Sequence, residues 1–249
     1  CAAKNSFMKL IKLDAIDSTN EFLKGISTQP DLENFTVVTA ENQTKGKGQM
    51  GAVWNSQAGK NLIMSVLVKD LLKDINEIFN LNIAVSLAVI TALKKNNIPD
   101  LSIKWPNDIL SANKKIGGIL IENIIKSDGT ILSIVGLGLN VNQTNFEGLP
   151  KASSLAVVTG KEFDKEKLLL EIIAHLEMNV AASKLNPASL RQQFVDLLYK
   201  KGVPMPFANS KDEKFMGMIQ GISTIGKLQV LLEDDSVAEF DIKEIQMLY

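Results

Sequence analysis

The pattern of apolar positions along residues 8–141 predicts short strands interrupted by one long helix. Runs rich in Val, Ile and Leu, bounded by polar or glycine-rich segments, indicate strands. These runs cover residues 8–15, 35–41, 61–69, 101–103, 116–125 and 130–141. Between the third and fourth runs, apolar residues recur on one face of a predicted helix over residues 74–95. The last two runs form a hairpin around Ser127-Asp128-Gly129.

Three further helices are expected. Ser18 caps a short helix that extends to about Lys24, with Glu21 at the capping-box position. Two longer helices are predicted over residues 165–184 and 187–201, and the second has a proline at its start.

After Gly202 the helical period disappears, and short strand patterns follow over residues 215–222, 227–232 and 238–242. Short, closely spaced strands are typical of a small β-barrel, here of about fifty residues. The expected fold class is therefore α+β. It consists of a main domain over residues 1–200 and a small C-terminal β domain over residues 201–249.

A glycine-rich loop over residues 42–60 joins the second and third strands, and it is too long and too polar for a hairpin turn. Gly46, Gly48 and Gly51 would allow its backbone to approach a ligand closely, with Lys47 between them as a cation. A mobile loop without a ligand has the same composition, so the loop alone leaves both interpretations open.

A second polar segment, Lys104-Trp105-Pro106-Asn107-Asp108, follows the fourth strand. Its proline ends the strand because it cannot donate to a β ladder. A cation, a flat ring, an amide and a carboxylate within one stiff turn suit a polyphosphate and its Mg²⁺. The alternative is an ordinary Pro-Asn-Asp turn with an exposed lysine and a core tryptophan, which the segment alone slightly favours.

Composition and charge narrow the function classes. The 249 residues are 45% hydrophobic and 22% charged, as in a globular protein, and 27 Lys and Arg against 28 Asp and Glu give a net charge of −1. This balance does not favour nucleic acid or an anionic membrane as a partner. The longest apolar stretch, residues 78–93, contains Asn80, Asn82 and Ser86. It is shorter than the roughly 20 residues of a membrane span, so no membrane association is expected.

The cysteine and histidine content limits the chemistry. A single cysteine, Cys1, excludes an internal disulfide, so a reducing and therefore cytoplasmic location is expected. Met8 is a candidate native start, which would make residues 1–7 an extension. The one histidine, His175, lies in a predicted helix. Neither a Cys–His pair nor a Ser-His-Asp triad is therefore expected, which favours a reaction whose substrates bring the nucleophiles.

Five segments carry polar or glycine-rich chemistry in a fixed order: DSTN (17–20), QTKGKGQMG (43–51), KWPND (104–108), KKIGGILIE (114–122) and GLGLNVN (136–142). In this order and at these spacings the chain resembles the catalytic domain of biotin protein ligases. These enzymes attach biotin to the carrier domains of acyl-CoA carboxylases. The resemblance extends from about residue 8 to residue 249.

The resemblance implies a central mixed sheet with helices packed on one side and an SH3-like C-terminal barrel. It also implies ATP, Mg²⁺ and biotin as ligands and biotinyl-5′-AMP as the intermediate. A lysine of a biotin carboxyl carrier protein or domain would be the acceptor, and a homodimer is compatible with the family. Sixteen residues precede Asp17, too few for a three-helix DNA-binding domain, so a short form without a repressor function is expected.

Biotin combines a neutral ureido ring, an apolar chain and a carboxylate, so its site needs hydrogen-bonding groups, a packing surface and cations. Ser18, Thr19 and Asn20 offer two hydroxyls and an amide, although capping could be the whole role of Ser18. By resemblance, the biotin-binding residues are Ser18, Thr19, Asn20, Gln43, Gly46, Lys47, Gly48, Gln49, Lys115, Gly118 and Gly136.

The resemblance also assigns the nucleotide side of the site. Lys115 would meet the biotin carboxylate and the α-phosphate, and it would share the catalytic role with Lys104. Lys114 precedes it on a strand, so one of the two side chains should point to solvent. Trp54 would cover the nucleotide or, equally, pack beneath the loop. The expected ATP-binding residues are Lys47, Trp54, Lys104, Asn107 and Asn140, with Asp108 as the Mg²⁺ ligand.

The loop departs from some relatives, in which arginines occupy the positions of Lys47, Gln49 and Met50. Because glutamine and methionine carry no charge, retention of the adenylate should be weaker here, and a catalytic role for Gln49 is open. A lipoate or octanoate ligase of the same superfamily is the nearest alternative, but the Arg-Arg, Gly-Gly-Gly and His-Asp segments expected of it do not occur in the sequence. A non-catalytic biotin-binding protein is a further alternative, in which the lysines would have no role.

Overall fold

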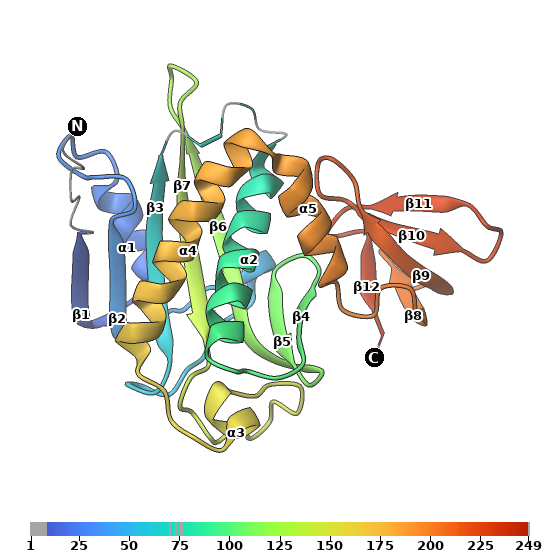
Figure 1. Ribbon diagram of the computed structural model, residues 1–249, viewed down its shortest axis with the longest axis horizontal. Helices are drawn as coiled ribbons and strands as arrows, with labels where there is room; N and C mark the ends of the chain where they lie inside the picture. Colours follow the sequence, from blue (N-terminus) through green and yellow to red (C-terminus); the bar gives the residue numbers. More distant parts are fainter. Residues whose placement is uncertain (1–8, 70, 73, 75–76, 249) are drawn as a thin grey trace.

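A seven-stranded sheet forms the centre of the computed structural model, which describes residues 9–69, 71–72, 74 and 77–248 (Figure 1). The β1–β2 pair is parallel and the other pairs are antiparallel, so the sheet is mixed, as predicted. The strand order is β1 (Leu10–Ile16), β2 (Val37–Gln43), β3 (Leu62–Lys69), β7 (Ile131–Leu139), β6 (Lys114–Ile125), β5 (Asp108–Ser111) and β4 (Leu101–Lys104).

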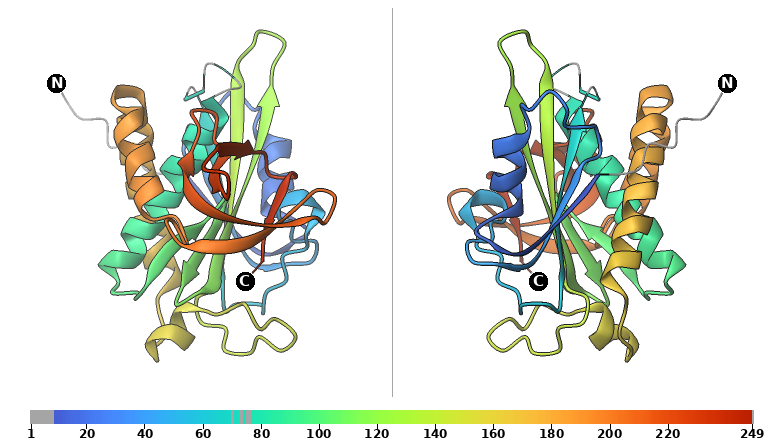
Figure 2. Two further views of the ribbon diagram at one scale, coloured as in Figure 1. Left: turned by 90° about the vertical axis from the view of Figure 1, so that its right-hand side faces the viewer. Right: turned by 90° about the vertical axis from the view of Figure 1, so that its left-hand side faces the viewer.

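The large helices cover one face of this sheet (Figures 1 and 2). They are α2 (Ile78–Lys95), α4 (Lys165–Leu185) and α5 (Pro187–Asp196), and the short α3 (Leu155–Thr159) precedes α4. The expected fold class is confirmed. One helix departs from it: α1 (Thr19–Ile26) lies on the opposite face, where Leu23 packs with Val38 and Leu67 in a separate apolar cluster.

The strand β3 is buried along both faces because side chains pack on each of them. Met64, Val66 and Val68 belong to the main core with α2, whereas Leu67 belongs to the cluster beneath α1. The helix α2 has the length and apolar composition of a membrane span, but 67% of its 18 residues are buried inside the protein. It packs against α4 and α5, so it is a core helix.

A second, fully antiparallel sheet follows α5 and confirms the predicted C-terminal β structure. Its buried side chains, such as Phe207 and Leu228, belong to the same hydrophobic core as α2 and α5, so the division at residue 200 stays a prediction. The strand order is β11 (Val237–Phe240), β10 (Leu228–Leu232), β9 (Lys214–Ile222), β8 (Pro204–Asn209) and β12 (Ile245–Met247).

The turn between β9 and β10 connects the small sheet to the polar turn of the main domain. The indole Nε1 of Trp105 donates to the carbonyl oxygen of Gly226 at 2.9 Å. The guanidinium of Arg191, on α5, donates to the carbonyl oxygen of Ser223 at 2.6 Å. Trp105 is therefore a core residue. The turn of the small sheet binds its indole, and Asn107 and Asp108 follow Trp105 in the same polar segment.

Several predicted boundaries were wrong. The helix predicted over residues 187–201 ends at Asp196, because the next residues form a bridge to β4. In this bridge Ile103 donates to the carbonyl oxygen of Leu197 and accepts from the N–H of Tyr199, each at 2.8 Å. The segment after β4 is a tight hairpin with a cis Trp105–Pro106 bond, so the chain returns at once as β5.

Other elements were not predicted, because their sequences do not carry the usual signals. They are β5, which has four residues, β8, which contains two prolines, β12, which has three residues, and α3, which has five. The first strand starts at Leu10 within the described residues, and α2 starts at Ile78. Met8 and the predicted extension over residues 1–7 lie outside the described residues.

Candidate active site

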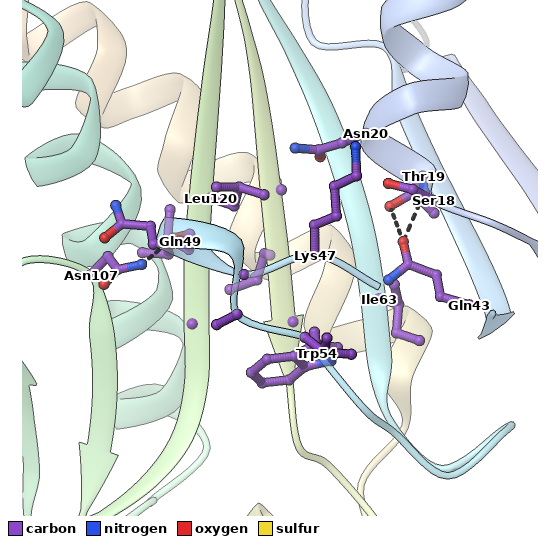
Figure 3. Close-up of a pocket in the computed structure, with 18 of the residues that line it drawn as sticks. Ser18, Thr19, Asn20, Gln43, Lys47, Gln49, Trp54, Ile63, Asn107 and Leu120 are labelled. Atoms are coloured by element: carbon purple, nitrogen blue, oxygen red, sulfur yellow. Dashed lines mark hydrogen bonds between the residues drawn. The ribbon is translucent and has the colours of Figure 1, made fainter. Parts of the chain in front are cut away.

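A cavity of about 240 Å³ opens between α1, the glycine-rich loop and strands β3, β6 and β7 (Figure 3). Most of the predicted site residues meet here, although they come from five separate segments of the sequence. Those that line the cavity are Ser18, Thr19, Asn20, Gln43, Lys47, Gly48, Gln49, Trp54, Asn107, Asp108, Lys115, Gly118 and Gly136.

Three predicted residues do not line the cavity. The carbonyl oxygen of Gly46 accepts from the N–H of Trp54 at 2.9 Å, so this glycine closes the loop on itself. Asn140 is buried and donates from Nδ2 to a backbone carbonyl at 3.0 Å. The Nζ of Lys104 lies 3.9 Å from a carboxylate oxygen of Asp108. The ligand-binding roles of these residues stay predictions.

The N-terminus of α1 supplies hydrogen-bonding groups to the cavity. The hydroxyl oxygen of Ser18 accepts from the N–H of Glu21 at 3.4 Å, so Ser18 caps the helix and also lines the cavity. Thr19 and Asn20 follow it and are almost fully buried. The Oε1 of Gln43, at the end of β2, accepts from the N–H of Thr19 at 2.8 Å and lies 3.0 Å from its hydroxyl oxygen.

Glycines on two neighbouring strands form the floor of the cavity. Gly118 on β6 lies opposite Gly138 on β7. A Cβ atom at Gly138 would lie 2.4 Å from Cε2 of Trp54, and one at Gly136 would lie 2.5 Å from Oδ1 of Asn20. Glycine is required at both positions because no other residue lets these side chains lie flat on the sheet.

Trp54 packs beneath the loop in this structure. Its Nε1 is buried and has no hydrogen-bond partner among the described residues, and Lys115 Nζ lies 5.7 Å from the ring centroid. A buried N–H without a partner costs free energy, so the indole is a hydrogen-bond donor that an acceptor on a ligand would satisfy. Of the two alternatives for Trp54, the structure has the packed arrangement, and contact with the nucleotide stays a prediction.

The opposite end of the cavity is charged. Lys115 Nζ lies 2.7 Å from Oδ1 of Asp108, on the adjacent strand β5, while Lys104 approaches the same carboxylate. Two ammonium groups and one carboxylate leave a net positive charge, which favours an anionic ligand. Lys114 is exposed, as the strand alternation predicts. Asn107 donates from Nδ2 to the carbonyl of Ile119, which holds this turn on β6.

These groups do not fit a divalent cation held by the protein. Among the described residues there is no group of three or more His, Cys, Asp or Glu side chains that could hold a metal. The carboxylate of Asp108 already faces two ammonium groups, which repel a cation. The role of Asp108 as a Mg²⁺ ligand therefore stays a prediction that its present contacts do not support.

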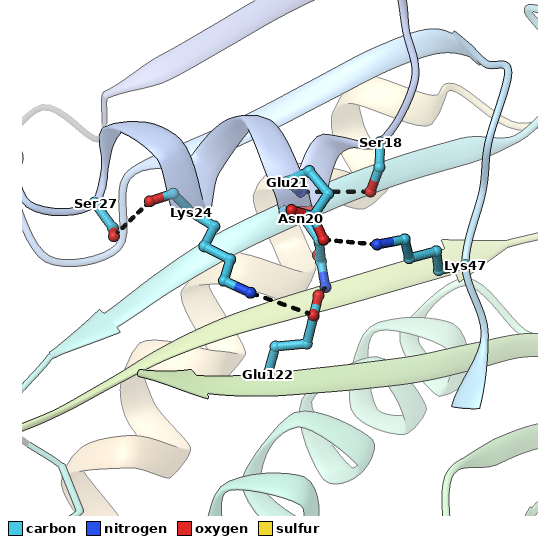
Figure 4. A network of polar contacts seen from close by, with 8 residues as sticks. Ser18, Asn20, Glu21, Lys24, Ser27, Lys47 and Glu122 are labelled. Carbon is cyan, nitrogen blue, oxygen red and sulfur yellow. Dashed lines mark hydrogen bonds and ion pairs between the residues drawn. The ribbon is translucent and has the colours of Figure 1, made fainter. Parts of the chain in front are cut away.

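An ion pair ties the loop to α1 beside the cavity, which Lys47 lines. Lys47 Nζ donates to Oε1 of Glu21 at 2.7 Å (Figure 4). This hydrogen bond lowers the pKa of Glu21 and raises the pKa of Lys47, so both groups are charged at neutral pH. An anionic ligand must compete with Glu21 for the cation of Lys47.

Sequence reasoning missed most of the apolar lining. One signal could have found part of it: Leu120 lies two residues after Gly118 on β6, so the strand period places both side chains on the same face. The remaining lining residues come from the loop and strand interiors. The full set that was not predicted is Ala52, Val53, Ile63, Met64, Ile119, Leu120 and Leu137. Gly138, in the GLGLNVN segment, lines the cavity together with Gly136, and both were expected to leave room for the ligand.

A comparison with protein families shows which family the residues of this cavity belong to. The model described as the biotin/lipoate A/B protein ligase family matches residues 13–142, which include all five polar segments and every residue that lines the cavity. The chain belongs to this family. The match also covers the two strands that form the glycine floor.

Individual relatives in the family are similar over most of the chain. The bifunctional ligase/repressor BirA of Bacillus spizizenii is 32% identical over 173 residues, which are 68% of this chain and 52% of the relative. A biotin–[acetyl-CoA-carboxylase] ligase of Mycobacterium tuberculosis is 30% identical over 66% of this chain and 60% of the relative. The chain thus spans about half the length of the first of these curated relatives.

Among solved structures, the biotin protein ligase from Aquifex aeolicus in complex with biotin and ATP is similar over almost the whole fold. The TM-score is 0.80 at 28% sequence identity, and the match covers 97% of this chain and 99% of that chain. The resemblance to biotin protein ligases that the five segments indicate is therefore confirmed in both sequence and fold.

Proposed function

We propose that this family member is a biotin protein ligase, which activates biotin with ATP and transfers it to a lysine of a biotin carboxyl carrier protein or domain. The observation that carries the proposal is the order of chemistry along the cavity. Hydrogen-bonding groups lie at α1, glycine and apolar residues follow, and Lys115 beside Asp108 lies at the end. This order corresponds to the ureido ring, the chain and the carboxylate of biotin.

The relatives support the same activity. The Mycobacterium tuberculosis protein bears the name of a biotin–[acetyl-CoA-carboxylase] ligase, and the Aquifex aeolicus enzyme holds biotin and ATP. A carrier protein as the partner and a cytoplasmic location are part of the proposal. A homodimer stays an expectation from the family.

In the first step of the proposed reaction, an oxygen of the biotin carboxylate attacks the α-phosphorus of ATP and pyrophosphate leaves. Lys115 neutralises the negative charge that gathers as carboxylate and phosphate approach. In the second step, the amine of a carrier lysine attacks the acyl carbon, AMP leaves, and the amine loses a proton. Both nucleophiles belong to substrates, so the protein aligns them, neutralises charge and excludes water.

Mg²⁺ belongs to this proposal as a companion of the ATP phosphates. ATP normally binds to enzymes with Mg²⁺ coordinated by its own phosphate oxygens and by water. This would require no cluster of protein carboxylates, in keeping with the single carboxylate at the charged end of the described cavity.

Pyrophosphate release tests the substrate class. With ATP and Mg²⁺ present, biotin should stimulate pyrophosphate release, whereas lipoate and octanoate should not. Stimulation by lipoate or octanoate alone would assign the chain to the other branch of its family. Tight binding of biotin without release of pyrophosphate would instead indicate a non-catalytic biotin-binding protein.

The Gln49→Arg variant should release biotinyl-5′-AMP more slowly than the unmodified protein. Gln49 lines the cavity, and an arginine there would add a cation near the phosphate, so we expect the off-rate of biotinyl-5′-AMP to fall by about tenfold. Met50→Arg is the matched control, because Met50 is 61% exposed and does not line the cavity. Stopped-flow or filter-binding measurements of the off-rate decide between them. Equal off-rates in the Gln49→Arg variant and the unmodified protein would show that neutral contacts already hold the adenylate.

A further inference from the structure

The side-chain amide of Asn20 bonds to two residues, on different strands, that do not line the cavity. On one side Ser65, a fully buried residue of β3, places its Oγ 2.6 Å from Oδ1 of Asn20. On the other side Glu122, on β6, accepts from Nδ2 of Asn20 at 2.8 Å (Figure 4). Gly136 lies between these strands and leaves room for the amide. We call Thr19, Ser65, Asn20 and Glu122 the Asn20 network.

The charge of Glu122 fixes the direction of the Asn20 amide, and the amide in turn fixes the proton of Ser65. An ionised carboxylate can only accept, so the NH₂ group of Asn20 must face Glu122 and its Oδ1 must face Ser65. The hydroxyl of Ser65 has one proton, which it donates to Oδ1 of Asn20. The oxygen of Ser65 is then an acceptor toward the hydroxyl of Thr19, which lies 2.7 Å away.

The consequence reaches the cavity through Thr19. The Thr19 hydroxyl lies 2.7 Å from Oγ of Ser65 and 3.0 Å from Oε1 of Gln43, so the shorter contact takes its proton, and the hydroxyl offers lone pairs to a ligand. The Thr19 hydroxyl then donates no proton to Oε1 of Gln43, which lies 3.0 Å away in the longest contact of the set. The Oε1 atom of Gln43 still accepts a hydrogen bond from the N–H of Thr19. This end of the cavity therefore offers an acceptor at Thr19 and donors at the Ser18 hydroxyl and the Gln43 amide.

We propose that Glu122 and Ser65 are positioning residues that fix the polarity of the ureido subsite, so that Thr19 accepts from a ring N–H of the ligand. The ligand class is a cyclic urea, or another ring that donates an N–H beside a carbonyl acceptor. This inference rests on the proposed function, because it takes biotin as the ligand. Glu122 and Ser65 act through Asn20 and Thr19 and touch no substrate themselves.

A double-mutant cycle on the full chain tests the inference, with biotin affinity measured by calorimetry. Glu122→Gln keeps the volume but allows the Asn20 amide to turn either way, and Ser65→Ala cuts the network. Each change should weaken biotin binding by about tenfold, the cost of one misdirected hydrogen bond. The double variant should also lose about tenfold, and not a hundredfold, because both changes break one chain of contacts. The KM for ATP should stay the same throughout.

Lys24→Met is the matched control. It removes the cation that lies 4.0 Å from Glu122 but leaves the carboxylate in place, so biotin affinity should stay within about twofold of the unmodified protein. A thermal melt of each variant shows whether it is folded. Independent tenfold losses that multiply, or no loss with Glu122→Gln, would overturn the proposal.

A ligand-free measurement separates this inference from the proposed function. In the ¹⁵N-labelled protein, one side-chain NH₂ proton of Asn20 should resonate far downfield, because it bonds to a carboxylate, and it should move upfield in Glu122→Gln. If that shifted proton is missing from the unmodified protein, the proposal fails whatever the protein binds. If it is present but biotin does not bind, the proposed function and the ureido assignment fail, while the proton directions stand.

Discussion

Lys115→Ala is expected to slow biotinyl-5′-AMP formation by about 10³-fold, or roughly 4 kcal/mol of transition-state stabilisation. The ammonium of Lys115 lies at the charged end of the cavity, 2.7 Å from Asp108. Without it, the approach of a carboxylate to a phosphate is uncompensated in a site that excludes water. Single-turnover kinetics with ATP and biotin measure the effect. The melting temperature should change little, because the Lys115 side chain is 38% exposed.

Lys114→Ala is the control for this substitution. It removes the same charge from the preceding position of β6, where the side chain is exposed, so turnover should stay near normal. If both variants lost activity equally, the effect would come from the general field of the strand and not from contact at the cavity. Near-normal turnover of the Lys115→Ala variant would remove Lys115 from the proposed mechanism.

Gly226→Ala is expected to lower the free energy of unfolding by about 3 kcal/mol or more. Gly226 has a φ of +90°, and a Cβ atom there would lie 2.1 Å from Cγ of Phe79. Phe79 cannot move away freely, because its ring packs edge-on against Phe194 with centroids 5.8 Å apart. The carbonyl of Gly226 also holds Trp105, so the variant should raise the KM for ATP through the adjacent turn. Chemical denaturation and steady-state kinetics measure the two effects.

Gly221→Ala, near the end of β9 and just before the same turn, is the matched control, because the nearest atom to its Cβ would lie at an ordinary 3.6 Å. It should leave both the stability and the KM for ATP nearly unchanged. If Gly226→Ala destabilised the protein but left the KM for ATP unchanged, the C-terminal sheet would support the fold without influencing the polar turn.

The sequence predicted well those elements whose signals are local. The strands and long helices follow from apolar periodicity, and the cap at Ser18 follows from residue type. The alternation of Lys114 and Lys115 on a strand also predicted that one of the two side chains would reach solvent, and this side chain is that of Lys114. Each of these features depends on a few neighbouring residues, so the amino-acid sequence alone is enough to predict it.

Contacts between distant segments could not be predicted in this way. Glu122 lies 102 residues from Asn20, and Ser65 lies 45 residues from it, so no local pattern joins them. The hydrogen bond from Trp105 to the carbonyl of Gly226, 121 residues later, likewise joins segments that no local pattern connects. The bond from the Asn140 amide to the backbone of Ser153 also could not be predicted, and the ligand role that the resemblance assigns to Asn140 stays a prediction.

The most direct measurement of the central proposal is mass spectrometry of the reaction products. Purified protein would be incubated with ATP, Mg²⁺ and biotin, with and without a biotin carboxyl carrier domain. We predict biotinyl-5′-AMP in the first mixture and one biotinylated lysine on the carrier in the second. An adenylate formed from lipoate or octanoate but not from biotin, or bound biotin that never becomes an adenylate, would contradict the proposed function.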